Sequence, residues 1–233
     1  MNRLKTMLGG LALIFVSGSL SAAMITNGDF ANSCSLNGWQ TDTDGFAGGI
    51  NDFTIDGSGP NCAASINVDY ANTDVYYAAN TLFQNLDLSA EVGSTFLLTM
   101  DFSVNSELTS NFQGFIADYF FVGLFDGSDY YNQNGGLGFL VAPTDINGSA
   151  NYSLSFELDN SFANQTNWSL DFQVLLGIDG SDTDFFGSSL AIRNVSLTEQ
   201  KIQVPARDSV ALVALGLFGL VARRKKLQTR ISV

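Results

Sequence analysis

The chain has 233 residues, of which 23 are acidic, ten are basic and none is histidine, so its formal net charge is −13. Residues 24–203 hold 22 acidic groups and only two basic ones, Arg193 and Lys201, which gives this stretch a net charge of −20. Such a body repels phosphates and is excluded as a non-specific binder of nucleic acid. The lack of histidine removes the commonest general base and zinc ligand. Two cysteines are too few for a cysteine-rich metal site, and the length suits one domain with a sizeable core.

The first 23 residues have the three parts of a secretory signal peptide. Arg3 and Lys5 form the positive start, residues 7–16 are apolar, and residues 21–23 are small. We therefore expect signal peptidase to cleave after Ala23. The alternatives are a buried N-terminal helix and an uncleaved anchor, although the apolar stretch is short for a membrane span, which needs about 20 residues.

The C-terminal end combines a linker at 200–209, an uncharged run at 210–222 and a basic tail at 223–233. A helix over 210–222 would be about 20 Å long, against about 30 Å for the hydrocarbon core of a bilayer, so it is a weak permanent anchor. The basic tail should stay cytoplasmic by the positive-inside rule. This topology and the signal peptide agree in placing the acidic body outside the inner membrane.

The C-terminal end resembles the PEP-CTERM sorting signal in the order of its three parts. Its recognition motif, short helix and basic stop correspond to Val204, Pro205 and Ala206, to residues 210–222, and to Arg223, Arg224, Lys225 and Lys226. The resemblance implies export in a Gram-negative bacterium that makes exopolysaccharide, transient residence in the inner membrane, and cleavage by an exosortase that releases the protein to the cell surface or matrix. The chain has Pro-Ala-Arg where the family has Pro-Glu-Pro, which bears on processing efficiency. The alternative is a plain single-pass tail anchor.

The stretch 24–199 has the periodicity of β-strands. Apolar and polar residues alternate over 96–104, 152–158 and 168–174, which predicts strands with one buried and one wet acidic face. Residues 119–125 are apolar on both faces and suit a central strand. The alternation slips by one residue between Ile192 and Val195, which predicts a β-bulge in the last strand. With Gly-, Asn- and Asp-rich loops between these runs, the pattern indicates an all-β fold, an antiparallel β-sandwich of the jelly-roll kind.

The body also resembles jelly-roll carbohydrate-binding modules of the galactose-binding-like type. Residues 25–30 with Gly38-Trp39 are similar to their opening strand, residues 81–89 to their second segment, and residues 190–198 to their closing strand, which pairs near the first. The resemblance implies the fold; sugar binding does not follow from the fold alone.

The two cysteines, Cys34 and Cys62, lie in loop-like sequence of an exported domain. An oxidising periplasm favours a disulfide between them. It would close a loop of about 28 residues and stabilise the fold by roughly 3 kcal/mol. Two free thiols are the alternative.

Acidic loops are the candidate metal sites, because Ca²⁺ prefers Asp, Asn and carbonyl oxygens. The chain has three such clusters, namely Asp179 with Asp182 and Asp184, Asp42 with Asp44, and Asp126 with Asp129. None completes an EF-hand pattern. The alternative is a solvated acidic surface that keeps the protein soluble.

Aromatic side chains are the candidate sugar contacts. Tyr130 and Tyr131 lie in a Gly- and Asn-rich loop and are the better surface candidates, and Trp39 is a further one, whereas Trp168 is in phase with an apolar face and is expected in the core. No nucleophile elbow, phosphate loop or histidine-based triad is present, so we expect no enzymatic activity. Two functions are left: a structural or interaction protein of the cell surface or extracellular polysaccharide matrix, sorted by its tail, or a carbohydrate-binding module for a defined glycan.

Overall fold

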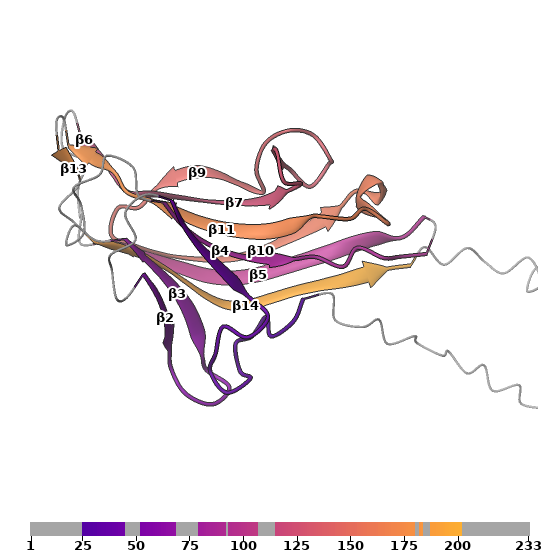
Figure 1. Ribbon diagram of the computed structural model, residues 1–233, viewed down its shortest axis with the longest axis horizontal. Coiled ribbons are helices and arrows are strands. Elements are labelled where there is room, and N and C mark those ends of the chain that lie inside the picture. The colour runs from indigo at the N-terminus through magenta and orange to yellow at the C-terminus, as the bar shows by residue number, and fades with distance from the viewer. Residues whose placement is uncertain are drawn as a thin grey trace, which may run out of the picture.

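Two antiparallel β-sheets lie face to face in the computed structural model of the protein (Figure 1). The structure describes residues 25–44, 52–68, 79–91, 93–106, 115–179, 182–183 and 187–201. The expected signal peptide, sorting motif, apolar helix and basic tail lie outside these residues. Among the described residues, no helix has the length and apolarity needed to cross a bilayer.

The first sheet, sheet I, forms the upper layer of the sandwich in Figure 1. Its strands follow the order β1-β4-β11-β7-β8, and β9 also pairs with β7. The bounds are β1 (Gln40–Asp44), β4 (Ala79–Asn85), β11 (Ser169–Leu175), β7 (Tyr119–Phe125), β8 (Tyr130–Tyr131) and β9 (Val141–Asp145). The expected central strand is therefore confirmed as β7, which has partners on both sides.

The second sheet, sheet II, has the order β10-β5-β14-β3-β2. The bounds are β10 (Ser149–Leu158), β5 (Thr95–Ser106), β14 (Ser188–Gln200), β3 (Ala63–Val68) and β2 (Phe53–Asp56). A small ribbon at one end of the sandwich and a 3-10 turn complete the described elements, with bounds β6 (Phe115–Ile116), β12 (Ile178–Asp179), β13 (Asp182–Thr183) and η2 (Asn160–Phe162). The two-sheet sandwich confirms the expected fold class, while jelly-roll connectivity stays a prediction.

The core lies between the sheets and is rich in phenylalanine. Phe102 of β5 packs against Phe120 of β7 and Phe172 of β11, with ring centroids 5.6 and 6.2 Å apart. All three side chains are at most 1% exposed. Burying one such side chain stabilises the fold by about 1.5–3 kcal/mol relative to leaving it in water. The alternation predicted over 96–104 therefore forms the main inner face of sheet II.

The predicted bulge lies in β14, where the register shifts between Ile192 and Asn194. Ile192 pairs with Phe102 and Asn194 with Asp101, so Arg193 is the extra residue. Both Arg193 and Asn194 are exposed, while Ile192 and Val195 are buried on the same inner face. The bulge thus corrects the phase of the strand and keeps its apolar residues in the core.

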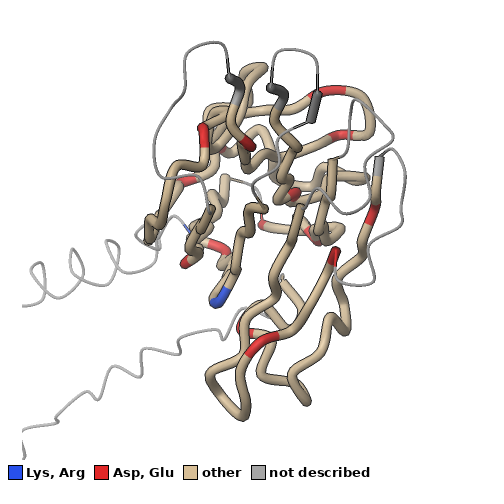
Figure 2. The backbone as a smooth tube through the Cα atoms, turned by 90° about the vertical axis from the view of Figure 1, so that its left-hand side faces the viewer, with Lys and Arg blue, Asp and Glu red and all other residues tan. Residues whose placement is uncertain are grey.

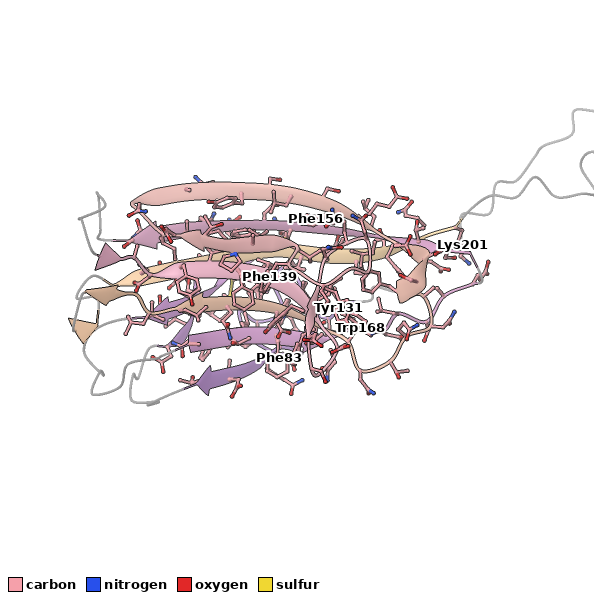
Figure 3. The ribbon with its side chains drawn as sticks, turned by 90° about the horizontal axis from the view of Figure 1, so that it is seen from above. Phe83, Tyr131, Phe139, Phe156, Trp168 and Lys201 are labelled. Atoms are coloured by element: carbon pink, nitrogen blue, oxygen red, sulfur yellow. A yellow bond between two sulfur atoms is a disulfide. The ribbon has the colours of Figure 1, made fainter. Side chains whose placement is uncertain are left out.

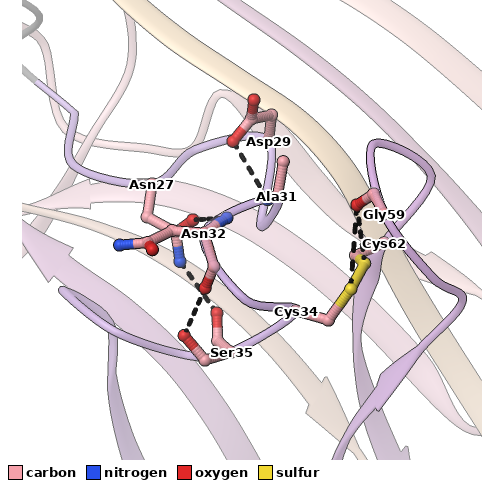
Figure 4. The surroundings of a disulfide bond; sticks show 8 residues. All are labelled: Asn27, Asp29, Ala31, Asn32, Cys34, Ser35, Gly59 and Cys62. Carbon is pink, nitrogen blue, oxygen red and sulfur yellow. Dashed lines mark hydrogen bonds between the residues drawn. A yellow bond between two sulfur atoms is a disulfide. The ribbon is translucent and has the colours of Figure 1, made fainter.

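The expected opening strand over 25–30 is wrong, because this segment is a series of bends and turns. Asn27 and Phe30 have left-handed backbones with φ of 52° and 54°, which a strand does not allow. The amide of Asn27 donates to Ser35 O at 2.8 Å and accepts from Asn32 N at 3.1 Å, closing the turns (Figure 4). Phe30 is nevertheless fully buried.

The closing strand does lie beside this first segment, as the resemblance implied. Val195 N donates to Gly28 O at 2.8 Å. A Cβ at position 28 would lie 2.0 Å from Val195 O, so only glycine allows this approach. Gln84, on β4 of sheet I, holds this segment in place with three hydrogen bonds. Its Oε1 accepts from Thr26 N at 2.6 Å, and its Nε2 donates to the carbonyls of Thr26 and Gly38, both at 2.9 Å.

The predicted disulfide between Cys34 and Cys62 is confirmed, with 5.5 Å between the two Cα atoms (Figure 4). Cys62 is 2% exposed and belongs to the core, and Cys34 packs against it from the N-terminal turns. Both sulfurs lie against the carbonyl oxygen of Gly59, at 3.7 and 3.2 Å. The bond therefore joins the turns to the start of β3.

Replacing both cysteines by serine should lower the free energy of unfolding by roughly 3 kcal/mol, because the unfolded chain regains the freedom of the 28-residue loop. The loss is measured by urea denaturation of the double variant and of the parent protein. A reducing agent should destabilise the parent and leave the double variant unchanged. Equal stability of the two proteins under oxidising conditions would contradict a structural role.

Candidate functional site

A groove of about 220 Å³ lies on the outer face of sheet I. Five strands, β1, β4, β7, β8 and β11, supply its walls and floor, which consist of Asp42, Thr81, Phe83, Phe125, Tyr130, Ser169, Asp171 and Gln173. The groove thus combines three aromatic rings with carboxylate, amide and hydroxyl groups. The antiparallel register brings them together, because Asp171 of β11 lies opposite Phe83 of β4 on one side and Gly123 of β7 on the other.

The aromatic wall comes from the outward residues of β7 and from the chain that follows it. Tyr130 lies 4.9 Å from Phe125, 5.0 Å from Phe121 and 5.4 Å from Phe139, measured between ring centroids. Phe121 is buried on this outer face, whereas Phe125, Tyr130 and Phe139 are half-exposed. β7 is therefore apolar on both faces for two reasons: one face meets the core and the other carries this wall.

Gly123 makes room for the Tyr130 ring. A Cβ at position 123 would lie 2.6 Å from Tyr130 Cδ1, so any larger residue there displaces the ring. From this position, the Tyr130 hydroxyl reaches β11 and donates to Asp171 Oδ2 at 3.1 Å. The tyrosine thus spans two strands of the sheet and is held at both ends.

Asp171 is buried at the floor of the groove, with 5% of its surface exposed. Ser169 Oγ donates to Asp171 Oδ1 at 2.5 Å, on the opposite side from the Tyr130 hydroxyl. Burial raises the pKa of Asp171, and these two hydroxyl donors oppose that rise without cancelling it. The expected wet acidic face of strand 168–174 is therefore wrong here: the aromatic wall covers Ser169 and Asp171.

The remaining polar groups of the groove come from β11, β4 and β1. Gln173 Nε2 donates to Thr81 Oγ1 at 2.6 Å, which fixes the amide between β11 and β4. Asp42, on the edge strand β1, is exposed. The arrangement offers oxygen acceptors for hydroxyl or ammonium donors and half-exposed aromatic faces for apolar ring surfaces.

The aromatic residues singled out in the sequence have different environments. Trp39 is 7% exposed, packs between Phe30 and Phe172, and donates from Nε1 to Asn27 O at 3.2 Å. Its ring belongs to the core and is not available to a ligand. Tyr130 lines the groove. Both Tyr130 and Tyr131 lie in the short strand β8 and not in a loop.

Tyr131 faces the other way. Its ring packs against Trp168 at 4.9 Å, and Figure 3 shows the two side chains next to each other toward one end of the sandwich. Trp168 also contacts the buried Phe162 at 5.0 Å, so its expected core role is supported by half-buried packing against the core. The structure therefore separates two neighbours in sequence, with Tyr130 at the groove and Tyr131 at the core edge.

The acidic clusters do not form a metal centre in the described residues. Asp126 uses Oδ1 to accept from the backbone N–H groups of Ser128 and Asp129, at 2.8 and 2.9 Å, which is a turn-forming role. These bonds lower the pKa of Asp126. No group of three or more Cys, Asp or Glu side chains in the described part of the chain is placed to hold a metal ion. Calcium binding by the acidic clusters therefore stays a prediction.

The structure does not describe the side chains of the cluster formed by Asp179, Asp182 and Asp184. The backbones of Asp179 and Asp182 pair between β12 and β13, and Asp184 is not described. The side chain of Asp44 is not described either, while its neighbour Asp42 lines the groove. The cluster at 42–44 therefore contributes one carboxylate, that of Asp42, to the groove.

A second hollow of about 480 Å³ lies on the outer face of sheet II, between the N-terminal turns and β14. Asp29 and Asn194 are among the residues that line it. Asp29 Oδ1 accepts from Ala31 N at 3.1 Å, so the carboxylate caps its own turn (Figure 4).

Sequence reasoning missed most of the groove. Phe83, Phe125, Asp171 and Gln173 carry no motif, and the alternation of strand 168–174 indicated only that Asp171 and Gln173 share a face. The missing information was which strands lie beside β11, since the register alone brings Phe83 and Gly123 next to Asp171.

Comparison with known proteins gives distant structural likenesses. No protein-family model and no curated protein matches the chain. The carbohydrate-binding module TmCBM61, solved with β-1,4-galactotriose, is 12% identical with a TM-score of 0.41, covering 77% of this chain and all of that one. The N-terminal cellulose-binding domain of a Cellulomonas fimi β-1,4-glucanase is 16% identical with a TM-score of 0.39, covering 78% and 99%.

The enzymatically active domain of a tailspike protein from bacteriophage CBA120 is 13% identical with a TM-score of 0.41, and the match covers 76% of this chain but 21% of that one. The chain is thus distantly similar to β-sandwich carbohydrate-binding modules and to part of an enzyme. At these TM-scores and identities, the likeness identifies no ligand.

Replacing Asp171 by asparagine should reduce the pH dependence of stability. The folded-state pKa of Asp171 lies above its ordinary value of 3.8, so its contribution to stability is fully present below pH 3.8 and is lost as the pH rises through the folded-state pKa. The asparagine side chain carries no charge, so Asp171→Asn does not lose this stability as the pH rises. We expect it to melt above the parent at pH 7, by about 2–4 °C for each kcal/mol gained, with the difference shrinking at pH 3.5.

Asp101→Asn is the control, and its melting temperature at pH 7 should change in the opposite direction. Ser153 and Asn194 donate to Asp101 at 2.6 and 2.9 Å and lower its pKa, so its contribution is present above pH 3.8 and is lost as the pH falls. This variant should melt below the parent at pH 7. Thermal melts followed by circular dichroism measure both; the same shift for Asp171→Asn at both pH values would contradict the buried carboxylate.

Proposed function

We propose that the protein is a non-enzymatic glycan-binding protein of the cell surface or extracellular matrix, and that the groove on sheet I is its binding site. The observation that carries the proposal is the meeting of half-exposed aromatic rings with fixed, partly buried oxygen and amide groups on one sheet face. A sugar ring has one apolar face and a rim of hydroxyl groups. Aromatic planes match the first, and hydrogen-bonding groups that are already oriented match the second.

The groove groups are held in place before any ligand arrives. Tyr130 is positioned by Gly123 and Asp171, and Gln173 is positioned by Thr81. Groups that are already ordered lose little conformational entropy on binding, which favours a specific site. Both oxygens of Asp171 accept hydrogen bonds from hydroxyl groups, which suits an acceptor that orients a ligand. This geometry favours the dedicated carbohydrate-binding hypothesis over a purely structural protein.

Phe83→Ala should weaken glycan binding at least about tenfold, equivalent to about 1.4 kcal/mol, because it removes an aromatic surface from the groove. The parent is first screened against polysaccharide from the producing culture and against defined oligosaccharides. Affinity for the best ligand is then measured by isothermal titration calorimetry.

Phe156→Ala is the matched control. Phe156 is also half-buried, but it lies on β10 of sheet II, and Figure 3 shows it well apart from Phe83, toward the opposite edge of the sandwich. Its removal should leave affinity unchanged. Equal losses for the two variants, or no saturable binding by the parent, would contradict the proposed site.

We also propose that the protein reaches its location through its two ends, on the support of sequence alone. Signal peptidase would remove residues 1–23, and an exosortase would cut near Val204, Pro205 and Ala206 after transient residence in the inner membrane. The alternative is an uncut chain anchored by residues 210–222. Both place the acidic domain outside the cytoplasm, where the Cys34–Cys62 disulfide is stable.

The mass of the mature protein tests this processing. Mass spectrometry of the cell-bound and released fractions should show loss of the first 23 residues and of about the last 29, with the released form lacking the tail. Removal of both ends takes away eight of the ten basic residues, so the mature form should also focus at lower pH. An intact chain ending in the basic tail in both fractions would contradict cleavage.

A further inference from the structure

All formal charge in the groove is negative. Asp42 and Asp171 line it, and no lysine or arginine does. The two basic residues between 24 and 203 are Arg193, in β14, and Lys201, directly after β14, both on sheet II. Figure 2 shows acidic positions spread over the described backbone and few basic ones. Lys201 pairs with Glu91 at 2.8 Å, and neither Lys201 nor Arg193 lines the groove.

This charge distribution discriminates between classes of glycan. A uronate, sulfate or phosphate group entering the groove meets two carboxylates, without any basic side chain of the body to offset the repulsion. The surrounding field of a body with net charge −20 adds to that repulsion. Anionic polysaccharides are therefore poor ligands for this site.

The carboxylates that repel an anionic ligand attract a ligand that carries an ammonium group. A carboxylate has about four acceptor positions, and the described hydroxyl donors on Asp171 are those of Ser169 and Tyr130, so capacity for a further donor exists at the groove floor. A hydrogen bond from an ammonium to a carboxylate is roughly twice as strong as one between neutral groups. The half-exposed faces of Phe83, Phe125 and Tyr130 also attract a cation through their ring quadrupoles.

We propose that the groove selects glycans that carry free amino groups, such as polymers of deacetylated amino sugars. The selection would come from Asp171 at the floor and Asp42 on the edge strand β1, with the aromatic rings contacting the sugar faces. This proposal rests on the proposed function, since it requires that the groove bind a glycan at all.

The burial of Asp171 gives a reason for the selection. In the protein without ligand, this carboxylate is enclosed by Ser169, Tyr130 and the sheet, and burial raises its pKa. A ligand cation at the floor would compensate the buried negative charge, whereas a neutral sugar hydroxyl would do so less well. The aromatic wall that covers Asp171 thus turns a common acidic surface residue into a determinant of ligand charge.

The test compares three β-1,4-linked trisaccharides that differ only in the substituent on C2 of each sugar ring. They are the trimers of glucosamine, N-acetylglucosamine and glucose. Each is titrated into the purified full-length protein at about 0.15 M salt and again at about 0.5 M. We expect the glucosamine trimer to bind about tenfold more tightly than the other two at low salt, with the preference falling at high salt.

Asp171→Asn and Asp42→Asn should each reduce this preference to about twofold or less. Asp42 is exposed on an edge strand, so its variant keeps the proposal testable if Asp171→Asn alters the fold. Asp101→Asn removes the same charge from sheet II and should keep the preference. An equal effect of all three substitutions would mean that bulk charge alone attracts the amine, and it would overturn the proposal.

Two further outcomes separate this inference from the proposed function. If all three trimers bind equally well and Phe83→Ala weakens each of them, the groove is a glycan site without charge selection, and the inference is overturned. If the amine-bearing trimer binds and Phe83→Ala has no effect, the binding occurs elsewhere and both proposals are overturned.

Discussion

The burial of one face of β5 is the constraint on which the sandwich depends. This twelve-residue strand pairs with β10 on one side and β14 on the other, and its alternate side chains from Phe96 to Val104 are buried. A one-residue slip in either neighbour would turn apolar residues out to water, so β5 fixes the register of sheet II. β14 satisfies this requirement only through its bulge at Arg193, which keeps both Ile192 and Val195 facing the core.

The groove depends on a second burial, on the opposite side of the molecule. β7 uses one face for the core and gives the other to Phe121, Gly123 and Phe125. Because position 123 has no side chain, Tyr130 lies over it and reaches Asp171 in the next strand. The same contact covers the carboxylate and exposes an aromatic face to the groove. Fold and proposed binding site therefore share one local arrangement, and a larger residue at 123 would disturb both.

The charge segregation of the chain has two separate consequences. At the ends, basic residues accompany the apolar segments and support the proposed export and sorting. In the body, the near-absence of cations leaves a groove with negative charge alone, which underlies the proposed choice of an amine-bearing glycan. The case for a ligand comes from the residues of this groove.

The sequence by itself determined the all-β class, the main strands, the central place of β7, the bulge in β14 and the disulfide, because alternation and cysteine count are local properties of the chain. It misplaced the first segment, since left-handed turns at Asn27 and Phe30 depend on hydrogen bonds with residues further along. Only the tertiary structure decided which polar residues are covered and which aromatic residues meet. The physical reason is that strand order and register bring Phe83, Tyr130 and Asp171 together from separate parts of the chain, and no periodicity within one strand encodes its neighbours.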